Sequence, residues 1–219
     1  MGKERNLPAV EVLLKAKRSI QQALIADPFN VMVRYLGCFL SYSLCVLQFS
    51  QEQAMASIRW MNNSLPLFTL GRASLQVTRE RIVLFKTRIQ LMLAEVHTLV
   101  DQKAEARQLL DSLQAEETTD NELKLEIVRI GAQASASPAE AIEILSGVSD
   151  DNAVKVKLAL ASSYVAKEDV ESAKTVYQAL VKQENASYSD RLLILFSAAH
   201  FFYKQGDLPA ASPIADEAF

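Results

Sequence analysis

Histidine and cysteine are the side chains of this sequence best suited to act as bases, nucleophiles or metal ligands. The chain has two of each, His97 and His200, Cys38 and Cys45. Catalysis or metal binding needs such groups in a recognisable local pattern, and we find no H-E-x-x-H, G-x-S-x-G, G-x-G-x-x-G or phosphate-loop motif. The cysteines and the two isolated histidines also lack a metal-ligand spacing. We therefore expect no enzymatic activity, no metal site and no cofactor.

The two cysteines predict the redox environment. Cys38 and Cys45 lie seven residues apart in one predicted helix, where about 10.5 Å of axial rise separates them. A disulfide needs Cα atoms within about 7 Å, so we expect reduced core thiols in a reducing compartment. The sequence opens without a charged and apolar secretory signal. These features predict a cytoplasmic or nuclear protein.

Composition and periodicity predict an all-α fold. Of 219 residues, 50% are hydrophobic and 22% are charged, which is enough apolar side chain for a packed core. Only 6 Gly and 6 Pro are present, so turn signals are few and long helices with short loops are favoured. Apolar residues recur at helical spacing and predict helices at 9–26, 30–49, 52–64, 71–100, 103–114, 120–134, 138–147, 151–166, 170–183, 188–205 and 208–219.

The charge is unevenly distributed along the chain. Residues 1–110 contain 14 Lys and Arg against 8 Asp and Glu, a balance of +6, while residues 111–219 contain 9 against 18, a balance of −9, and the two sum to −3. No dense basic tract is present, which argues against nucleic acid as the main ligand. The two halves could instead offer unlike charge to different partners.

One stretch, residues 36–49, is uncharged and needs to be tested as a membrane span. It is 14 residues long, whereas a spanning helix needs about 18 or more. Ser41, Ser43 and Gln48 also dilute its apolar character. We expect a buried helix and no transmembrane segment.

Small residues indicate where helices pair. Two antiparallel helices approach closely only where Ala or Gly lies at the crossing, with larger apolar residues beside it. Residues 155–182 have this arrangement on two helices joined by a short polar turn, and the second helix repeats it at i, i+4 and i+7. The residues concerned are Leu160, Ala161 and Tyr164, then Ala173, Tyr177 and Leu180.

This pattern resembles the tetratricopeptide repeat, a helix–turn–helix unit of about 34 residues. Further segments share its offsets: Ala16, Ile20, Ala23 and Asp27-Pro28-Phe29-Asn30; Leu36-Gly37; Ala94, His97, Ala106, Leu110 and Leu113; and Ala199, Phe202, Gly206, Ala211 and Ala215. The resemblance implies an α-solenoid of antiparallel helix pairs, with about 10–11 helices in a right-handed superhelix. The whole chain, 1–219, is then a single domain or a fragment of a longer array. Residues 50–72 and 115–138 fit poorly, which leaves other stacks of helix pairs as an alternative.

Residues 71–100 depart from the repeat because their helix is twice the usual length. Leu84, Leu91 and Leu93 add a second apolar side to a heptad pattern. The helix is interpreted either as a central spine packed on both sides or as a coiled-coil seam for homodimerisation. The heptad consists of Leu75, Ile82, Phe85, Ile89, Met92, Val96 and Leu99.

In the tetratricopeptide family, ligands contact outward-facing positions of the first helix of each pair, which line a concave surface. Carried onto this sequence, the resemblance implies the candidate partner-binding residues Arg34, Tyr42, Arg88, Glu95, Phe196, His200, Tyr203 and Lys204, with Cys38, Ser41, Leu91 and Thr98 on the same faces. The aromatic pair of Phe196 and Tyr203 is the most suggestive, since aromatic side chains anchor partners. The Lys and Asn that clamp a carboxylate in chaperone-binding members are absent here.

These features predict a scaffold or adaptor subunit of a multiprotein assembly. It would bind other protein subunits or peptides in a concave groove, or bury helix 31–49 against a neighbouring subunit. One alternative is a membrane-trafficking or tethering subunit that uses the basic N-terminal half on anionic surfaces. Another is a regulatory protein that homodimerises through residues 71–100.

Overall fold

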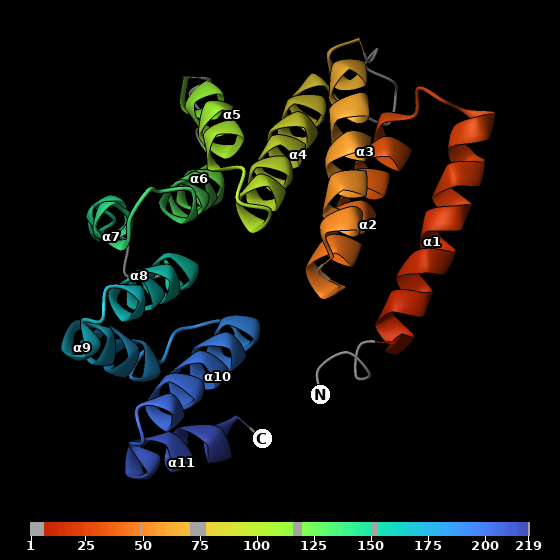
Figure 1. Ribbon diagram of the computed structural model, residues 1–219. Helices are drawn as coiled ribbons and strands as arrows, with labels where there is room; N and C mark the ends of the chain where they lie inside the picture. Colours follow the sequence, from red (N-terminus) through yellow and green to blue (C-terminus); the bar gives the residue numbers. More distant parts are fainter. Residues whose placement is uncertain (1–6, 49, 71–77, 116–119, 150–152, 219) are drawn as a thin grey trace. The chain divides into compact units, whose positions relative to one another are not determined.

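The computed structural model describes residues 7–48, 50–70, 78–115, 120–149 and 153–218, and these residues form eleven α-helices and no β-strand (Figure 1). The prediction of an all-α fold is confirmed. The chain divides into two compact units, residues 1–118 with α1–α5 and residues 119–219 with α6–α11. The helices are α1 (Leu7–Ala26), α2 (Val31–Leu47), α3 (Gln51–Leu70), α4 (Arg79–Leu99), α5 (Lys103–Ala115), α6 (Asn121–Gln133), α7 (Pro138–Ser146), α8 (Val154–Ala166), α9 (Val170–Val181), α10 (Tyr188–Lys204) and α11 (Leu208–Glu217).

Side-chain caps determine where many of the helices begin. Asn30 accepts a hydrogen bond from the Val33 N–H at 3.1 Å at the start of α2, and Ser187 accepts one from the Asp190 N–H at 3.2 Å at the start of α10. Such caps satisfy N–H groups that have no partner within the helix. Because Asn, Ser, Asp and Pro mark these positions in the sequence, most of the predicted boundaries lie within a few residues of the observed ones.

Helix α3 is longer than the sequence predicts. We expected it to end before Pro66, yet it continues to Leu70. Pro66 removes one helix hydrogen bond, to the carbonyl of Asn62, at a cost of about 3 kcal/mol. Beyond it, Phe68 is buried in the core of the first unit, which contributes about 1.5–3 kcal/mol. Burial of Phe68 offsets the cost of the proline, so the expected stop was wrong.

Helix α4 is shorter than the sequence predicts. It begins at Arg79, where Thr78 is the cap and accepts a hydrogen bond from the Arg81 N–H at 3.3 Å. The helix predicted over 71–100 therefore has 21 residues instead of 30, and Leu75 of the heptad lies outside the described residues.

Most heptad side chains of α4 point into the first unit, except Leu99, which is 42% exposed. Ile82, Phe85, Ile89 and Val96 belong to its core, with Met92 packed against them. These side chains are covered by the unit's own helices, since α4 contacts α2, α3 and α5. These buried positions agree with the spine interpretation, and homodimerisation through this helix stays a prediction.

Three helix pairs share the same turn. Helices α4 and α5, α8 and α9, and α10 and α11 are each joined by three residues, of which the second is left-handed: Asp101 (φ 60°), Glu168 (φ 65°) and Gly206 (φ 75°). The N–H of the third residue donates to the carbonyl five residues earlier, which closes the first helix in a Schellman motif. These bonds are Gln102 to His97 at 2.8 Å, Asp169 to Tyr164 at 2.9 Å and Asp207 to Phe202 at 2.9 Å.

Small side chains lie where the helices of the second unit meet. Ala161, Ala173 and Ala198 are completely buried in a core that Leu180 and Phe202 also fill. The core joins helices that contact one another, α8 with α9, α8 with α10, α9 with α10, and α10 with α11 (Figure 1). The predicted helix pair over 155–182 is confirmed. The single domain over 1–219 and the right-handed superhelix stay predictions.

Gly37 marks the closest helix approach in the first unit. A Cβ atom at this position would lie 3.1 Å from Cζ2 and Nε1 of Trp60 on α3, and 3.3 Å from Cγ2 of Ile20 on α1. Side chains from two helices therefore enclose the position, and any larger residue must displace them. The Leu36-Gly37 pair of the sequence corresponds to a real packing constraint.

We predict that Gly37→Leu lowers the free energy of unfolding by about 1–3 kcal/mol, because the added side chain overpacks the α1–α2–α3 contact. The single tryptophan, Trp60, lies at that contact, so its fluorescence during urea unfolding measures the effect. Gly147→Leu is the matched control, since Gly147 is exposed and only the Ile144 carbonyl oxygen lies near its added Cβ, at 3.6 Å. Equal stability of the two variants would contradict the close packing.

Candidate functional site

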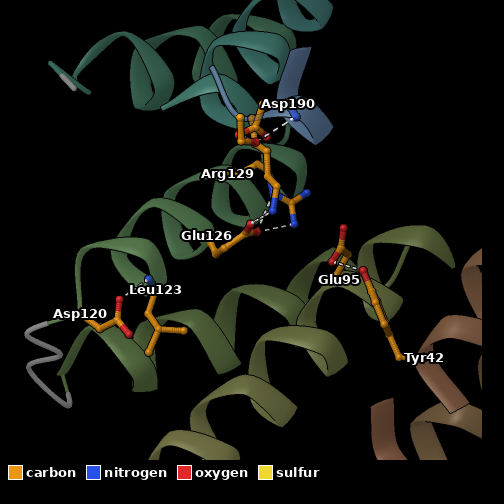
Figure 2. Close-up of polar contacts among 9 residues, drawn as sticks. Tyr42, Glu95, Asp120, Leu123, Glu126, Arg129 and Asp190 are labelled. Atoms are coloured by element: carbon orange, nitrogen blue, oxygen red, sulfur yellow. Dashed lines mark hydrogen bonds and ion pairs between the residues drawn. The ribbon is translucent and has the colours of Figure 1, made fainter. Parts of the chain in front are cut away.

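Two of the predicted partner-binding residues meet in the first unit. The Tyr42 hydroxyl on α2 donates to Oε2 of Glu95 on α4 at 2.7 Å, and both side chains are partly buried (Figure 2). A bond between a hydroxyl and a carboxylate is stronger than one between neutral groups. The hydrogen bond joins α2 to α4, so these two predicted binding residues also stabilise the contact between their helices.

The other predicted residues of the first unit are separate from this pair. Arg34 donates from Nε to the Pro28 carbonyl at 2.6 Å and so closes the turn between α1 and α2. Thr98 donates to the Glu95 carbonyl at 2.7 Å. Arg88 is partly buried two turns before Glu95 on the same helix. The structure therefore brings together only part of the predicted set.

Three residues expected on the outward face are buried instead: Cys38, Ser41 and Leu91. Helix α2 turns Cys38 toward Trp60 and Ser64 of α3, and burial raises the pKa of its thiol to about 11. Burial also raises the pKa of Cys45. Both cysteines are free and buried, which confirms the predicted core thiols, and the raised pKa values keep them unreactive at neutral pH.

Helix α2 also has an exposed apolar stripe, which we call the α2 stripe. Its residues lie on one side of the helix and are each more than a third exposed, with no other helix of the described residues covering them: Leu36, Phe39, Val46 and Leu47. We expected a buried helix here, and the structure buries only one side of it. Among the described residues, no helix is long and apolar enough to cross a membrane.

The predicted residues of the last helix pair do gather. Phe196, His200 and Tyr203 line one side of an open groove of about 560 Å³ between α10 and α11. Lys204 is exposed and does not line this groove. We call this surface the α10–α11 groove, and its remaining lining residues are Ala199, Leu208, Ala211, Ser212 and Ala215.

The groove combines exposed aromatic side chains with a floor of small residues. Phe196 is 50% exposed and Tyr203 is 63% exposed, and they lie two turns apart on one side of α10. Ala199 of α10 and Ala211 of α11 also line the groove, and their small side chains leave space above the backbone. A concave apolar surface with aromatic walls suits another protein's side chains.

A charged cluster that the sequence analysis missed lies in the second unit. Glu126 on α6 accepts hydrogen bonds from Nε of Arg129 at 2.8 Å and from Nζ of Lys155 on α8 at 3.1 Å (Figure 2). Burial of Glu126 opposes its ionisation, but the two cations outweigh burial and hold the pKa of this carboxyl below its ordinary value. These three side chains line a cleft of about 330 Å³, and Asp190 at the start of α10 lines it too. The i, i+3 spacing of Glu126 and Arg129 on one helix is a signal that could have found this ion pair, whereas Lys155 is 29 residues away in the sequence and gives no local signal.

The two histidines lie in different units and in different surroundings. His97 is buried, and its Nδ1 lies 2.7 Å from Oε1 of Gln102 at the turn after α4. His200 belongs to the α10–α11 groove in the other unit. Within the described ranges, no group of three or more His, Cys, Asp and Glu side chains is placed to hold a metal ion.

We predict that Glu126→Gln lowers the free energy of unfolding at neutral pH by about 1–2 kcal/mol, because Arg129 loses its charged partner in a partly buried position. The pKa of Glu126 is lower in the folded state, so its contribution is present above its ordinary value of 4.5 and is lost as the pH falls through the folded value. Denaturant unfolding followed by circular dichroism across this range should therefore show the two proteins converging in acid.

Glu143→Gln is the control, since Glu143 is exposed on α7 and forms no ion pair with the described residues. A constant difference between wild type and Glu126→Gln at every pH would contradict the ionic contribution.

No protein-family profile and no curated protein matches the sequence. Among solved structures, the crystal structure of BtubC (BKLC) from P. vanneervenii is similar, with a TM-score of 0.49 and 16% sequence identity over 100% of this chain and 90% of that chain. At this identity and TM-score, the similarity assigns neither a family nor a function.

Proposed function

We propose that this chain is a scaffold or adaptor subunit that binds partner proteins through the surface of stacked helix pairs. The observation that carries the proposal is the α10–α11 groove, where the exposed side chains of Phe196, His200 and Tyr203 line one wall. Aromatic anchors beside small residues are typical of protein contacts. The repeated three-residue turn supports a tetratricopeptide-like solenoid as the framework.

The α2 stripe supplies a second contact surface in the other unit. Leu36, Phe39 and Val46 expose large apolar side chains, and Arg34 is the single charged residue of α2. An uncharged apolar stripe of this kind suits a permanent neighbour whose own apolar residues cover it. Two separate surfaces for different partners agree with the role of an adaptor.

A membrane-tethering role is the second candidate, since the α2 stripe shares its unit with exposed cations of α1, including Lys15 and Arg18. Attraction to anionic lipid weakens as salt screens it. Co-sedimentation with phosphatidylserine vesicles that is lost in high salt would support this role. Binding that is absent at low salt would remove it.

We predict that Phe196→Ala/Tyr203→Ala loses partner proteins that wild type retains. Phe196 is 50% exposed and Tyr203 is 63% exposed, so the variant should fold and lose anchoring contacts. The measurement is quantitative mass spectrometry of proteins captured by the tagged full chain. The matched control is Tyr188→Ala/Leu193→Ala, which removes an exposed aromatic and an exposed apolar side chain of the same helix outside the groove. An unchanged partner set for the groove variant would contradict the proposal.

A further inference from the structure

The open side of α2 is arranged symmetrically about Ser43. Apolar side chains lie four and three residues before Ser43, and three and four residues after it: Phe39 and Leu40, then Val46 and Leu47. At 3.6 residues per turn, these positions share one side of the helix. All five side chains are at least partly exposed. This side therefore presents the same order of apolar and small side chains from either end of the helix.

Ser43 has the properties of a residue at a helix crossing. Its side chain is small, and its hydroxyl already donates to the Phe39 carbonyl at 2.9 Å, so burial of Ser43 leaves no donor without a partner. Within each unit, helices approach most closely at such small residues, as at Gly37 and Ala161, with larger apolar side chains beside them. A further helix can approach α2 at Ser43 in the same way.

Helices from before and after α2 in the chain pack on its other sides. Helix α2 contacts α1, α3 and α4. Gly37 lies against Trp60 of α3 and Ile20 of α1, and Tyr42 is bonded to Glu95 of α4. The directions of residues 37, 42 and 43 lie roughly a third of a turn apart around the helix. The side centred on residue 43 is thus flanked by helices of the first unit.

We infer that this side of α2 binds the same side of α2 in a second copy of the chain, with the two helices antiparallel and crossing at Ser43. A two-fold interface uses one patch on both copies, so the patch must match itself when reversed. With Ser43 at the axis, Phe39 of one copy meets Leu47 of the other, and Leu40 meets Val46. The inference rests on the proposed role of the α2 stripe as a contact surface, and it names the partner.

The charge of α2 agrees with the antiparallel arrangement. Its single charged residue is Arg34, nine residues before Ser43, so the two copies of Arg34 lie about 27 Å apart along the helix axis. A parallel arrangement would place them side by side. Antiparallel pairing also brings the N-terminus of each helix beside the C-terminus of the other, where opposite ends of the helix dipoles attract. Because the stripe has no charged residue, nothing in it selects a partner of opposite charge.

The first test measures the mass of the full chain by light scattering as its concentration is raised. We expect twice the mass of one chain at high concentration. Ser43→Glu places two carboxylates at the axis and should weaken the dimer about tenfold or more, because like charges face each other there. The matched control is Ser19→Glu, since Ser19 is exposed on α1 and its hydroxyl also donates to the carbonyl four residues earlier, that of Lys15. Circular dichroism checks that both variants keep their helices.

The second test locates the axis by a cysteine crosslink. Ser43→Cys brings two thiols together, so mild oxidation should join the copies by a disulfide. Leu36→Cys should not crosslink, because its two copies lie about 21 Å apart along the axis, beyond the roughly 7 Å between Cα atoms that a disulfide spans. Wild type serves as the blank, since Cys38 and Cys45 are buried.

A single-chain mass at every concentration, a dimer that survives Ser43→Glu, or equal crosslinking at residues 36 and 43 would overturn the inference. A single-chain mass with vesicle binding that Ser43→Glu abolishes would assign the stripe to a membrane and overturn it too. Capture of partners by the Phe196→Ala/Tyr203→Ala variant is a separate measurement. A dimer with an unchanged partner set supports the inference and contradicts the proposed groove, whereas a single-chain mass with lost partners does the reverse.

Discussion

The structure depends on how closely one helix can approach the next. At Gly37, where Trp60 and Ile20 lie within 3.3 Å of an added Cβ, and at the buried alanines of the second unit, small side chains let the helix backbones come together. Larger apolar residues then fill the spaces beside each crossing at the density of a protein interior. A helix with one apolar side is stable in such a stack because its neighbouring helices cover that side.

The turns apply a second constraint in the same places. A left-handed residue after α4, α8 and α10 reverses the chain within three residues. Because the connection is so short, the following helix must pack against the preceding one. Glycine adopts this conformation without cost at Gly206, whereas Asp101 and Glu168 adopt it at a cost of about 1 kcal/mol each. That Asp and Glu are held there indicates how strongly the packing of the helix pairs determines the turn.

The sequence predicted the helices well because helical spacing and caps are local properties. It placed α2 by Asn30, and the pair over 155–182 by Ala161 and Ala173. It failed at Pro66, where burial of Phe68 outweighs a local stop signal. It also failed for Cys38 and Ser41, since a rotation of the helix about its own axis by less than half a turn moves a residue from the surface to the core. Long-range pairs such as Glu126 with Lys155 leave no trace in local spacing.

Exposure separates the residues that build the stack from those available for contact. Tyr177 and Phe196 are similar in size and both lie on helices of the second unit, yet Tyr177 is 5% exposed and Phe196 is 50% exposed. The difference is not one of composition, because the floor beside each is alanine. It arises because Tyr177 packs in the core against Phe201 of α10, whereas Phe196 lines the open α10–α11 groove. Such half-exposed aromatic side chains are the kind of residue that anchors a partner protein, which is why the proposed scaffold role is placed at this groove.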